Sequence, residues 1–225
     1  MRSPARSGTY NGDMPGEKRP SHADVIDLLN RYRCPIPFHA VRARFMGSIA
    51  SPLDRSPVRA IQELWGGELP PFDAREDLNH LLDVLVNGLW NPLTAHQAGS
   101  NPFKLTRLQA GPAREGLHRY ALVRKQEIEG FMDGLFGPHE ELDLPESARD
   151  GVEVLGEMRA MLAGVVTLLD DPGQPSAPDD LKGLGDNLQA LAIILEKEMN
   201  TVVLSCTRAR RQAPADIRHI KPIVH

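Results

Sequence analysis

The stretch "PFDAREDLNHLLDVLVNGLWNPLTAH", residues 71–96, sets the pattern for the whole chain. Its apolar residues recur every three or four positions, which is the period of one face of an α-helix: Leu78, Leu81, Leu82, Leu85, Val86 and Leu89. Asp73 and Glu76 resemble a capping box at the start of this helix. Asn91–Pro92 predicts its end or a kink, because proline lacks the amide donor that a helix needs. We therefore predict one amphipathic helix with its polar residues in water.

The same period continues through most of the sequence, and no stretch shows the strict alternation of a half-buried strand. Ser21 and Ser56–Pro57 are typical helix starts, whereas Gly66–Gly67 is a typical helix end. The sequence therefore predicts an all-α fold, an irregular bundle of about seven helices that are short at the N-terminal end and long at the C-terminal end. We place them at about 21–33, 37–50, 57–65, 73–91, 113–136, 146–170 and 179–211.

Composition divides the chain into three parts. Residues 1–20 are rich in Pro, Gly, Ser and charge, which predicts a disordered leader. Residues 21–211 form the expected helical domain, and residues 212–225 form a loose tail. The Gly-, Pro- and Ser-rich connection at 97–113 is a candidate subdomain boundary, although one continuous helical domain fits the sequence equally well.

Charge and hydropathy exclude several classes of protein. The formal net charge is −4, but both ends are basic, so the body between residues 21 and 207 is strongly acidic. An acidic body repels a phosphate backbone, so we expect no nucleic-acid binding through it. No apolar run reaches the roughly 18 residues that cross a bilayer, and residues 1–20 lack the apolar segment of a secretory signal. We expect a cytoplasmic protein whose two cysteines, Cys34 and Cys206, are reduced, with one disulfide as the alternative.

Two carboxylate–histidine pairs at i,i+3 spacing raise the question of a metal site: Asp77–His80 and Glu115–His118. In di-metal helical bundles such pairs project inward from two helices, together with a Glu from each of two others. Here His80 lies off the leucine stripe and His118 lies near a helix start. We favour solvated surface pairs, and we keep a metal-dependent enzyme using these four residues as the alternative.

Other catalytic motifs are missing from the sequence. It has no Gly-x-Ser-x-Gly elbow and no phosphate-binding loop, and we predict no cofactor. Arg31, Arg33, Arg42 and Arg44 could gather into a positive patch on the acidic body, which would suit an acidic partner or an anionic metabolite.

Several motifs occur in a fixed order along about half of the chain. They are "FMGSIASP" (45–52), Pro57, "LWGGELPPF" (64–72), a leucine helix closing in "LWNPL" (89–93) and "EIEGFMDGLFG" (127–137). In this order they resemble the YecA/YgfB-like family of bacterial proteins, with matches at Pro52, Asn91, Gly130, Phe131 and Gly134. The resemblance implies an all-α fold and a non-enzymatic role. The sequence departs from the family at His39-Ala40, where a His-Gly or Asp-Gly pair is common, and it lacks the family's zinc-binding C-terminal module.

Within the matched motifs, Gly130 and Gly134 form a small-residue strip that lets another helix approach closely, and Trp65 is expected to pack against its Gly-Gly turn. We predict a regulator or adaptor that contacts a protein partner through Arg42, Arg44 and Trp65–Gly67. A pocket for a small ligand between the matched helices is a further alternative. The long apolar face of the helix at 179–211 fits a homodimer, with packing across the protein's own bundle as the alternative.

Overall fold

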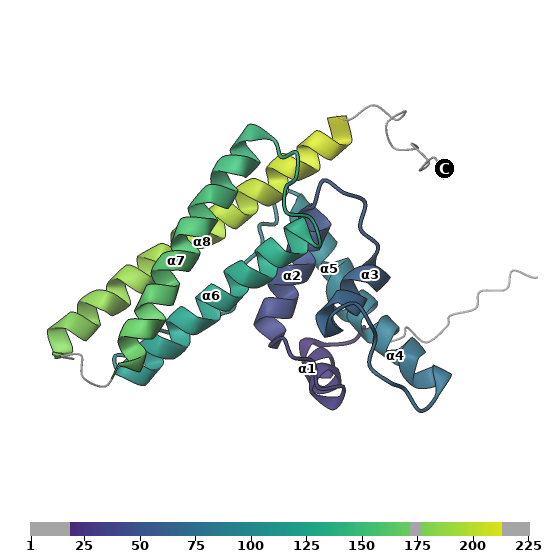
Figure 1. Ribbon diagram of the computed structural model, residues 1–225, viewed down its shortest axis with the longest axis horizontal. Helices are drawn as coiled ribbons and strands as arrows, with labels where there is room; N and C mark the ends of the chain where they lie inside the picture. The colour runs from purple at the N-terminus through teal and green to yellow at the C-terminus, as the bar shows by residue number, and fades with distance from the viewer. Residues whose placement is uncertain (1–18, 172–176, 213–225) are drawn as a thin grey trace, which may run out of the picture.

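The computed structural model describes residues 19–171 and 177–212, and all regular structure in these ranges is helical (Figure 1). This confirms the all-α fold. The leader prediction for residues 1–18 and the tail prediction for 213–225 lie outside the described residues. The elements are α1 (His22–Arg31), α2 (Phe38–Ala50), α3 (Pro57–Gln62), η1 (Glu63–Trp65), α4 (Arg75–Leu85), η2 (Val86–Trp90), α5 (Asn91–Thr94), η3 (Ala95–Gln97), α6 (Arg114–Phe136), α7 (Glu146–Asp170) and α8 (Pro178–Gln212).

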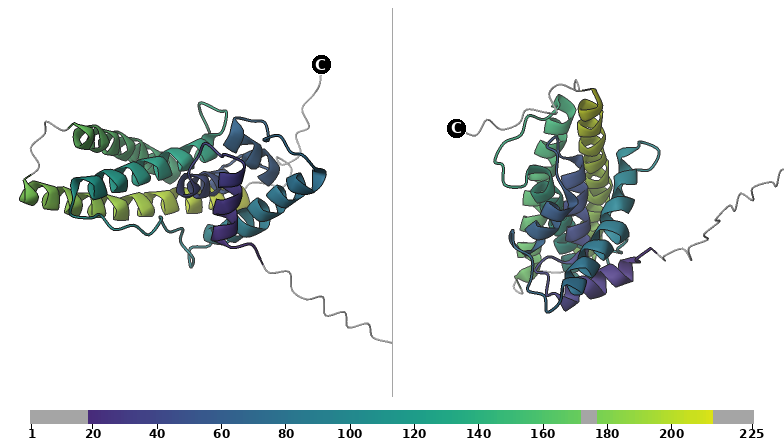
Figure 2. Two further views of the ribbon diagram at one scale, coloured as in Figure 1. Left: turned by 90° about the horizontal axis from the view of Figure 1, so that it is seen from below. Right: turned by 90° about the vertical axis from the view of Figure 1, so that its right-hand side faces the viewer.

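The long helices α6, α7 and α8 lie side by side, and the short helices cluster at one end of them (Figures 1 and 2). Helix α2 belongs to the short group but packs along α6 and also contacts α8. One hydrophobic core therefore runs from α1 to α8 and includes residues on both sides of the connection at 97–113. None of the helices in the described ranges combines the length and hydropathy needed to span a membrane.

Most predicted helix ends are confirmed. The Ser21 hydroxyl accepts the Asp24 amide while the Asp24 carboxylate accepts the Ser21 amide, so α1 starts in a capping box. At the start of α3 the Ser56 hydroxyl accepts the Arg59 amide, a cap without the reciprocal bond. Gly66 closes η1 with φ of 83°, a left-handed conformation that glycine adopts without strain.

In the leucine-rich stretch the predicted capping box is wrong, and of the two outcomes predicted at Asn91–Pro92, an end or a kink, the end does not occur. Helix α4 begins after Ala74, with no side-chain cap, so Asp73 and Glu76 form no capping box. The helix also continues past the predicted end, through a π-helical turn at Val86–Trp90 into α5. Pro92 is tolerated there because it lies in the first turn of α5, where its missing amide costs little. The turn places Trp90 edge-on to Phe45, with ring centroids 5.4 Å apart.

Helices α2 and α6 approach each other through glycines. A Cβ added at Gly130 or Gly134 would lie under 3.0 Å from the carbonyl oxygens of Ala40 and Arg44, closer than real Cβ atoms come. Gly47 on α2 meets the backbone of Phe131 in the same way. The predicted small-residue strip on α6 is thus confirmed, and Gly47 is the matching position that the sequence analysis did not single out.

Candidate functional site

The four residues of the metal hypothesis do not come together. His80 is exposed, and Asp77 lies 3.4 Å from Arg31. His118 instead lies 2.9 Å from Asp170, at the far end of α7. Among the described residues no three His, Cys, Asp or Glu side chains are grouped so that they could hold a metal ion. This arrangement contradicts a di-metal centre built from Asp77, His80, Glu115 and His118.

The two arginines of the predicted interaction surface make contacts inside the protein. Arg42 stacks on the Phe103 ring, 4.6 Å from its centroid, and donates to the carbonyl of Lys104. Burial lowers the pKa of Arg42 from its ordinary value. Arg44 is largely buried and lies 3.4 Å from Asp133. The expected patch of free arginines is therefore wrong at these positions, since both side chains already hold other parts of the chain.

The remaining predicted residues contact other parts of the protein where their contacts are described. The Trp65 indole N–H donates to the Tyr32 carbonyl at 3.0 Å, and Gly66 and Gly67 form an exposed turn. His39 lies 2.8 Å from the amide oxygen of Gln126, which ties α2 to α6. Asn91 donates to the side chain of Asn87 one turn earlier. Phe131 is fully buried, and Pro52 is partly buried in the turn after α2.

The connection after η3 contains an extended segment, residues 103–108, which we call the strap. Side chains from three helices bind its backbone. On α8, Asn200 accepts the Phe103 amide at 2.7 Å and donates to the Phe103 carbonyl at 2.9 Å. Also on α8, Glu196 accepts the Leu105 amide at 3.1 Å. Phe103 and the Leu105 amide thus face α8, whereas the Arg42 contact shows Lys104 directing its carbonyl toward α2.

A buried ion pair on α6 holds Thr106 in the same manner. Glu127 accepts the Thr106 amide at 2.8 Å, and Arg124 donates to the Thr106 carbonyl at 2.8 Å. Arg124 and Glu127 lie 2.5 Å apart, with side chains 6% and 1% exposed. Both charges are compensated by each other and by the strap, which is the condition under which buried ions are tolerated. The strap and the ion pair therefore depend on each other.

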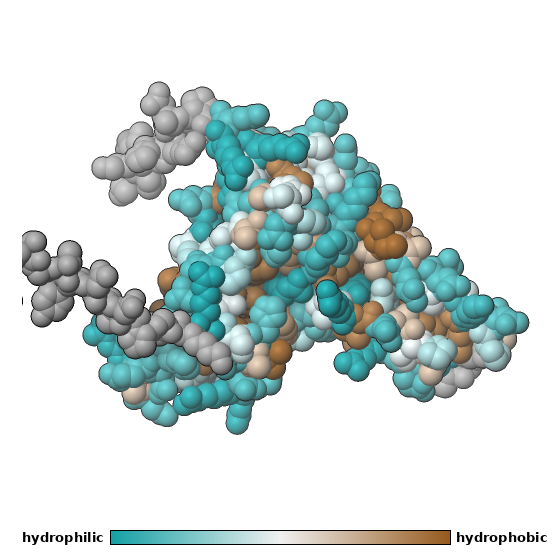
Figure 3. All heavy atoms as spheres, turned by 180° about the vertical axis from the view of Figure 1, so that it is seen from behind, coloured by the Kyte–Doolittle hydropathy of each residue, from teal (hydrophilic) through white to brown (hydrophobic). Residues whose placement is uncertain are grey.

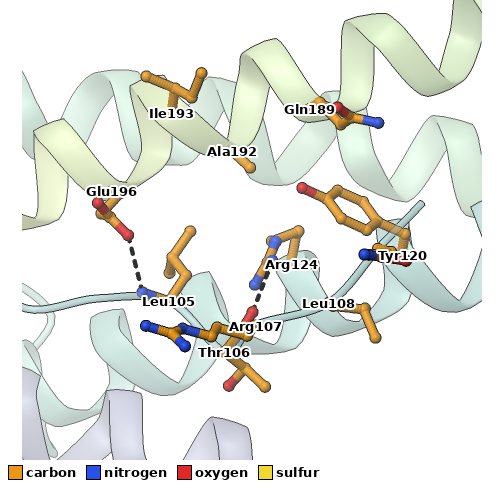
Figure 4. A pocket seen from close by; sticks show the side chains of 11 residues that line it. Leu105, Thr106, Arg107, Leu108, Tyr120, Arg124, Gln189, Ala192, Ile193 and Glu196 are labelled. Atoms are coloured by element: carbon orange, nitrogen blue, oxygen red, sulfur yellow. Dashed lines mark hydrogen bonds between the residues drawn. The ribbon is translucent and has the colours of Figure 1, made fainter.

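Between the strap, α6 and α8 lies an open groove of about 690 Å³. Figure 4 shows Tyr120 and Arg124 of α6 on one wall and Gln189 and Ala192 of α8 on the other, with Ile193 at the outer edge of α8. A second hollow of about 360 Å³ continues it toward the start of α8, and Gln189 lines both. Together they follow α8 from Pro178 to Glu196, a length of about 27 Å at the helical rise.

One exposed large apolar side chain, Ile193, lies at the edge of this groove. Ile193 is 72% exposed, the highest value among the large hydrophobic residues described as exposed. Seen from behind, a hydrophobic patch stands out on the part of the surface that the long helices form (Figure 3). A pocket between the matched helices α2 and α6 also exists, but its volume is only about 210 Å³. The groove along α8 is therefore the main candidate for a binding site.

Sequence reasoning missed the strap and its ion pair, although one signal was available. Tyr120, Arg124, Glu127 and Phe131 follow one helical stripe at i, i+4, i+7 and i+11, so the two charged residues occupy core positions. A core stripe interrupted by opposite charges three residues apart predicts a buried ion pair. Nothing local predicts that its partner is the backbone of residue 106. No protein-family model, curated protein or solved structure matches the chain.

Proposed function

We propose that this protein is a regulator or adaptor that works through contacts with another protein, and that the groove along α8 is its contact surface. The observation that carries the proposal is the exposed Ile193 on the rim of an open groove. A large apolar side chain in water gains free energy when a partner covers it, by about 25 cal/mol for each Å² buried. The resemblance to the YecA/YgfB-like family and a cytoplasmic location are parts of the same proposal.

A homodimer through α8 is the second candidate. Ile193 and Ile194 are both exposed, and so are Met161 and Leu168 on the neighbouring α7. These side chains offer a second copy of the chain an apolar contact. Both candidates use Ile193, so one position is able to separate them.

A photo-crosslinking amino acid placed at position 193 tests the proposal in cells that naturally express the protein. The matched control is the same amino acid at Val58, which is 43% exposed and far from the groove in the chain. We expect an adduct with one other protein at 193 and none at 58. An adduct at twice the mass of the chain would favour the homodimer instead. Equal labelling at both positions, or none at 193, would contradict the assignment of this surface.

A further inference from the structure

We propose that the groove binds an extended, acidic peptide segment of the partner, which pairs with the backbone of the strap at Arg107. This inference rests on the proposed function and specifies the chemistry of the partner at the same site. Peptides that add a strand to an unpaired edge gain affinity from main-chain hydrogen bonds and specificity from pockets for alternate side chains.

The free edge follows from the alternation of an extended chain. Phe103 and Leu105 present backbone groups to α8, so the same edge at Arg107 faces the groove that separates it from α8. Asn200 and Glu196 bind the edge at the first two positions. Within the described ranges, neither the amide nor the carbonyl of Arg107 has a hydrogen-bond partner. The groove therefore begins where the side chains of α8 stop reaching the strap.

The walls of the groove suit a strand rather than a helix. Leu105 lines it from the strap and Ala192 lines it from α8, and Ile193 lies at its outer edge. A peptide strand paired with Arg107 would place its alternate side chains against these apolar groups. A helix satisfies its own backbone and would leave the Arg107 amide unpaired.

Charge favours an acidic peptide. Arg124 is neutralised by Glu127, and Glu196 lies 2.7 Å from Lys104. Arg107 is exposed and has no counter-ion among the residues that the structure describes. In the continuation of the groove Lys182 and Asp186 carry one charge of each sign. The uncompensated charge of the site is therefore the Arg107 guanidinium, on a protein whose body is otherwise acidic.

Selection of phage-displayed random seven-residue peptides on the full-length protein tests this inference. Enriched peptides are then synthesised, and their affinities are measured by fluorescence polarisation. We expect an enriched sequence with acidic residues between alternating apolar ones. Methylation of a central peptide amide should weaken its binding about tenfold, because it removes a main-chain donor.

Three substitutions of Arg107 separate the contribution of its backbone amide to peptide binding from the contribution of its charge. Arg107→Pro deletes the amide and should weaken binding about tenfold, whereas Arg107→Ala keeps the amide and should cost about threefold or less. Arg107→Glu should weaken binding more than Arg107→Ala. Arg119→Glu, at an exposed arginine of α6 outside the groove, is the matched charge control. Thermal unfolding monitored by circular dichroism verifies that each variant is folded.

Peptides that bind Arg107→Pro and Arg107→Ala equally, or that tolerate amide methylation, would overturn the pairing. Failure to enrich any peptide would overturn it as well. In either case a partner crosslinked at position 193 would leave the proposed function standing, so the two proposals fail separately.

Discussion

Helix α6 has two sides that are built in different ways. Toward α2 it presents Gly130 and Gly134, and the backbones of the two helices touch. Toward the strap and α8 it presents Arg124 and Glu127, whose long side chains bind the backbone of Thr106 from a distance. The first side leaves only a small pocket, and the second leaves an open groove of about 690 Å³.

The difference shows how one helix serves architecture and recognition together. Small residues bring backbones into contact and remove the space between them. Charged side chains span a gap, and they hold a chain segment without covering its other edge. On the polar side of α6 the backbone groups of Arg107 therefore stay unpaired, in the described part of the chain, beside the groove along α8.

The largest expected effect comes from a substitution on the polar side of α6. Glu127→Ala leaves Arg124 buried without its counter-ion and removes the acceptor of the Thr106 amide, so we expect a loss of about 3–5 kcal/mol in the free energy of unfolding. Urea denaturation measures it. Glu129→Ala is the control, because Glu129 pairs with Lys125 on a more exposed face and should cost about 0.5 kcal/mol or less. Equal losses in the two variants would contradict the role of the buried pair.

The next largest effect comes from a substitution on the glycine side of α6. Gly134→Ala drives a methyl group into the backbone of Arg44, which cannot move away, and should cost about 2–3 kcal/mol. Gly164→Ala on α7 is the matched control, since nothing lies within 4 Å of its Cβ position. That substitution should stabilise the helix by about 0.5–1 kcal/mol, the ordinary advantage of alanine over glycine. Urea denaturation of both variants should therefore give shifts of opposite sign.

A smaller effect appears as a pH dependence. Burial raises the pKa of the Cys206 thiol from 9.0 to about 11, so the unfolded chain ionises this group first. Through this thiol the free energy of unfolding is independent of pH below about pH 9. It decreases as the pH rises from 9 to about 11, because the unfolded chain loses its proton first. The free energy of unfolding of Cys206→Ala should decrease less steeply over this pH interval than that of the unchanged protein. Parallel curves would show that water reaches the thiol in the folded state.

The smallest expected effect on stability is at the groove itself. Ile193→Asp replaces a side chain that water already surrounds, so the free energy of unfolding should change by about 0.5 kcal/mol or less. Binding of the selected peptide should nevertheless be lost. A large loss of stability would mean that Ile193 packs within the protein rather than at a free surface. Chemical denaturation and fluorescence polarisation on one preparation give both values.

The fold was predictable because the spacing of leucines and glycines over a few residues determines where helices form and how closely they pack. The stripe in residues 71–96, the Ser21 cap and the Gly130–Gly134 strip each follow from a spacing of a few residues. The site was not predictable in the same way. Arg42 and Arg44 look like free surface cations in the sequence, yet their partners Lys104 and Asp133 lie 62 and 89 residues away. No local spacing indicates such pairs, and the same holds for Thr106 and its ion pair.

Amide hydrogen exchange resolved by residue tests the central claim most directly. The amides of Leu105 and Thr106 are bound by Glu196 and Glu127, so they should exchange slowly. The amide of Arg107, two residues beyond Leu105 on the same edge, should exchange fast in the free protein and become slow when the selected peptide is bound. An Arg107 amide that exchanges as slowly as that of Thr106 before any peptide is added would contradict a free strap edge.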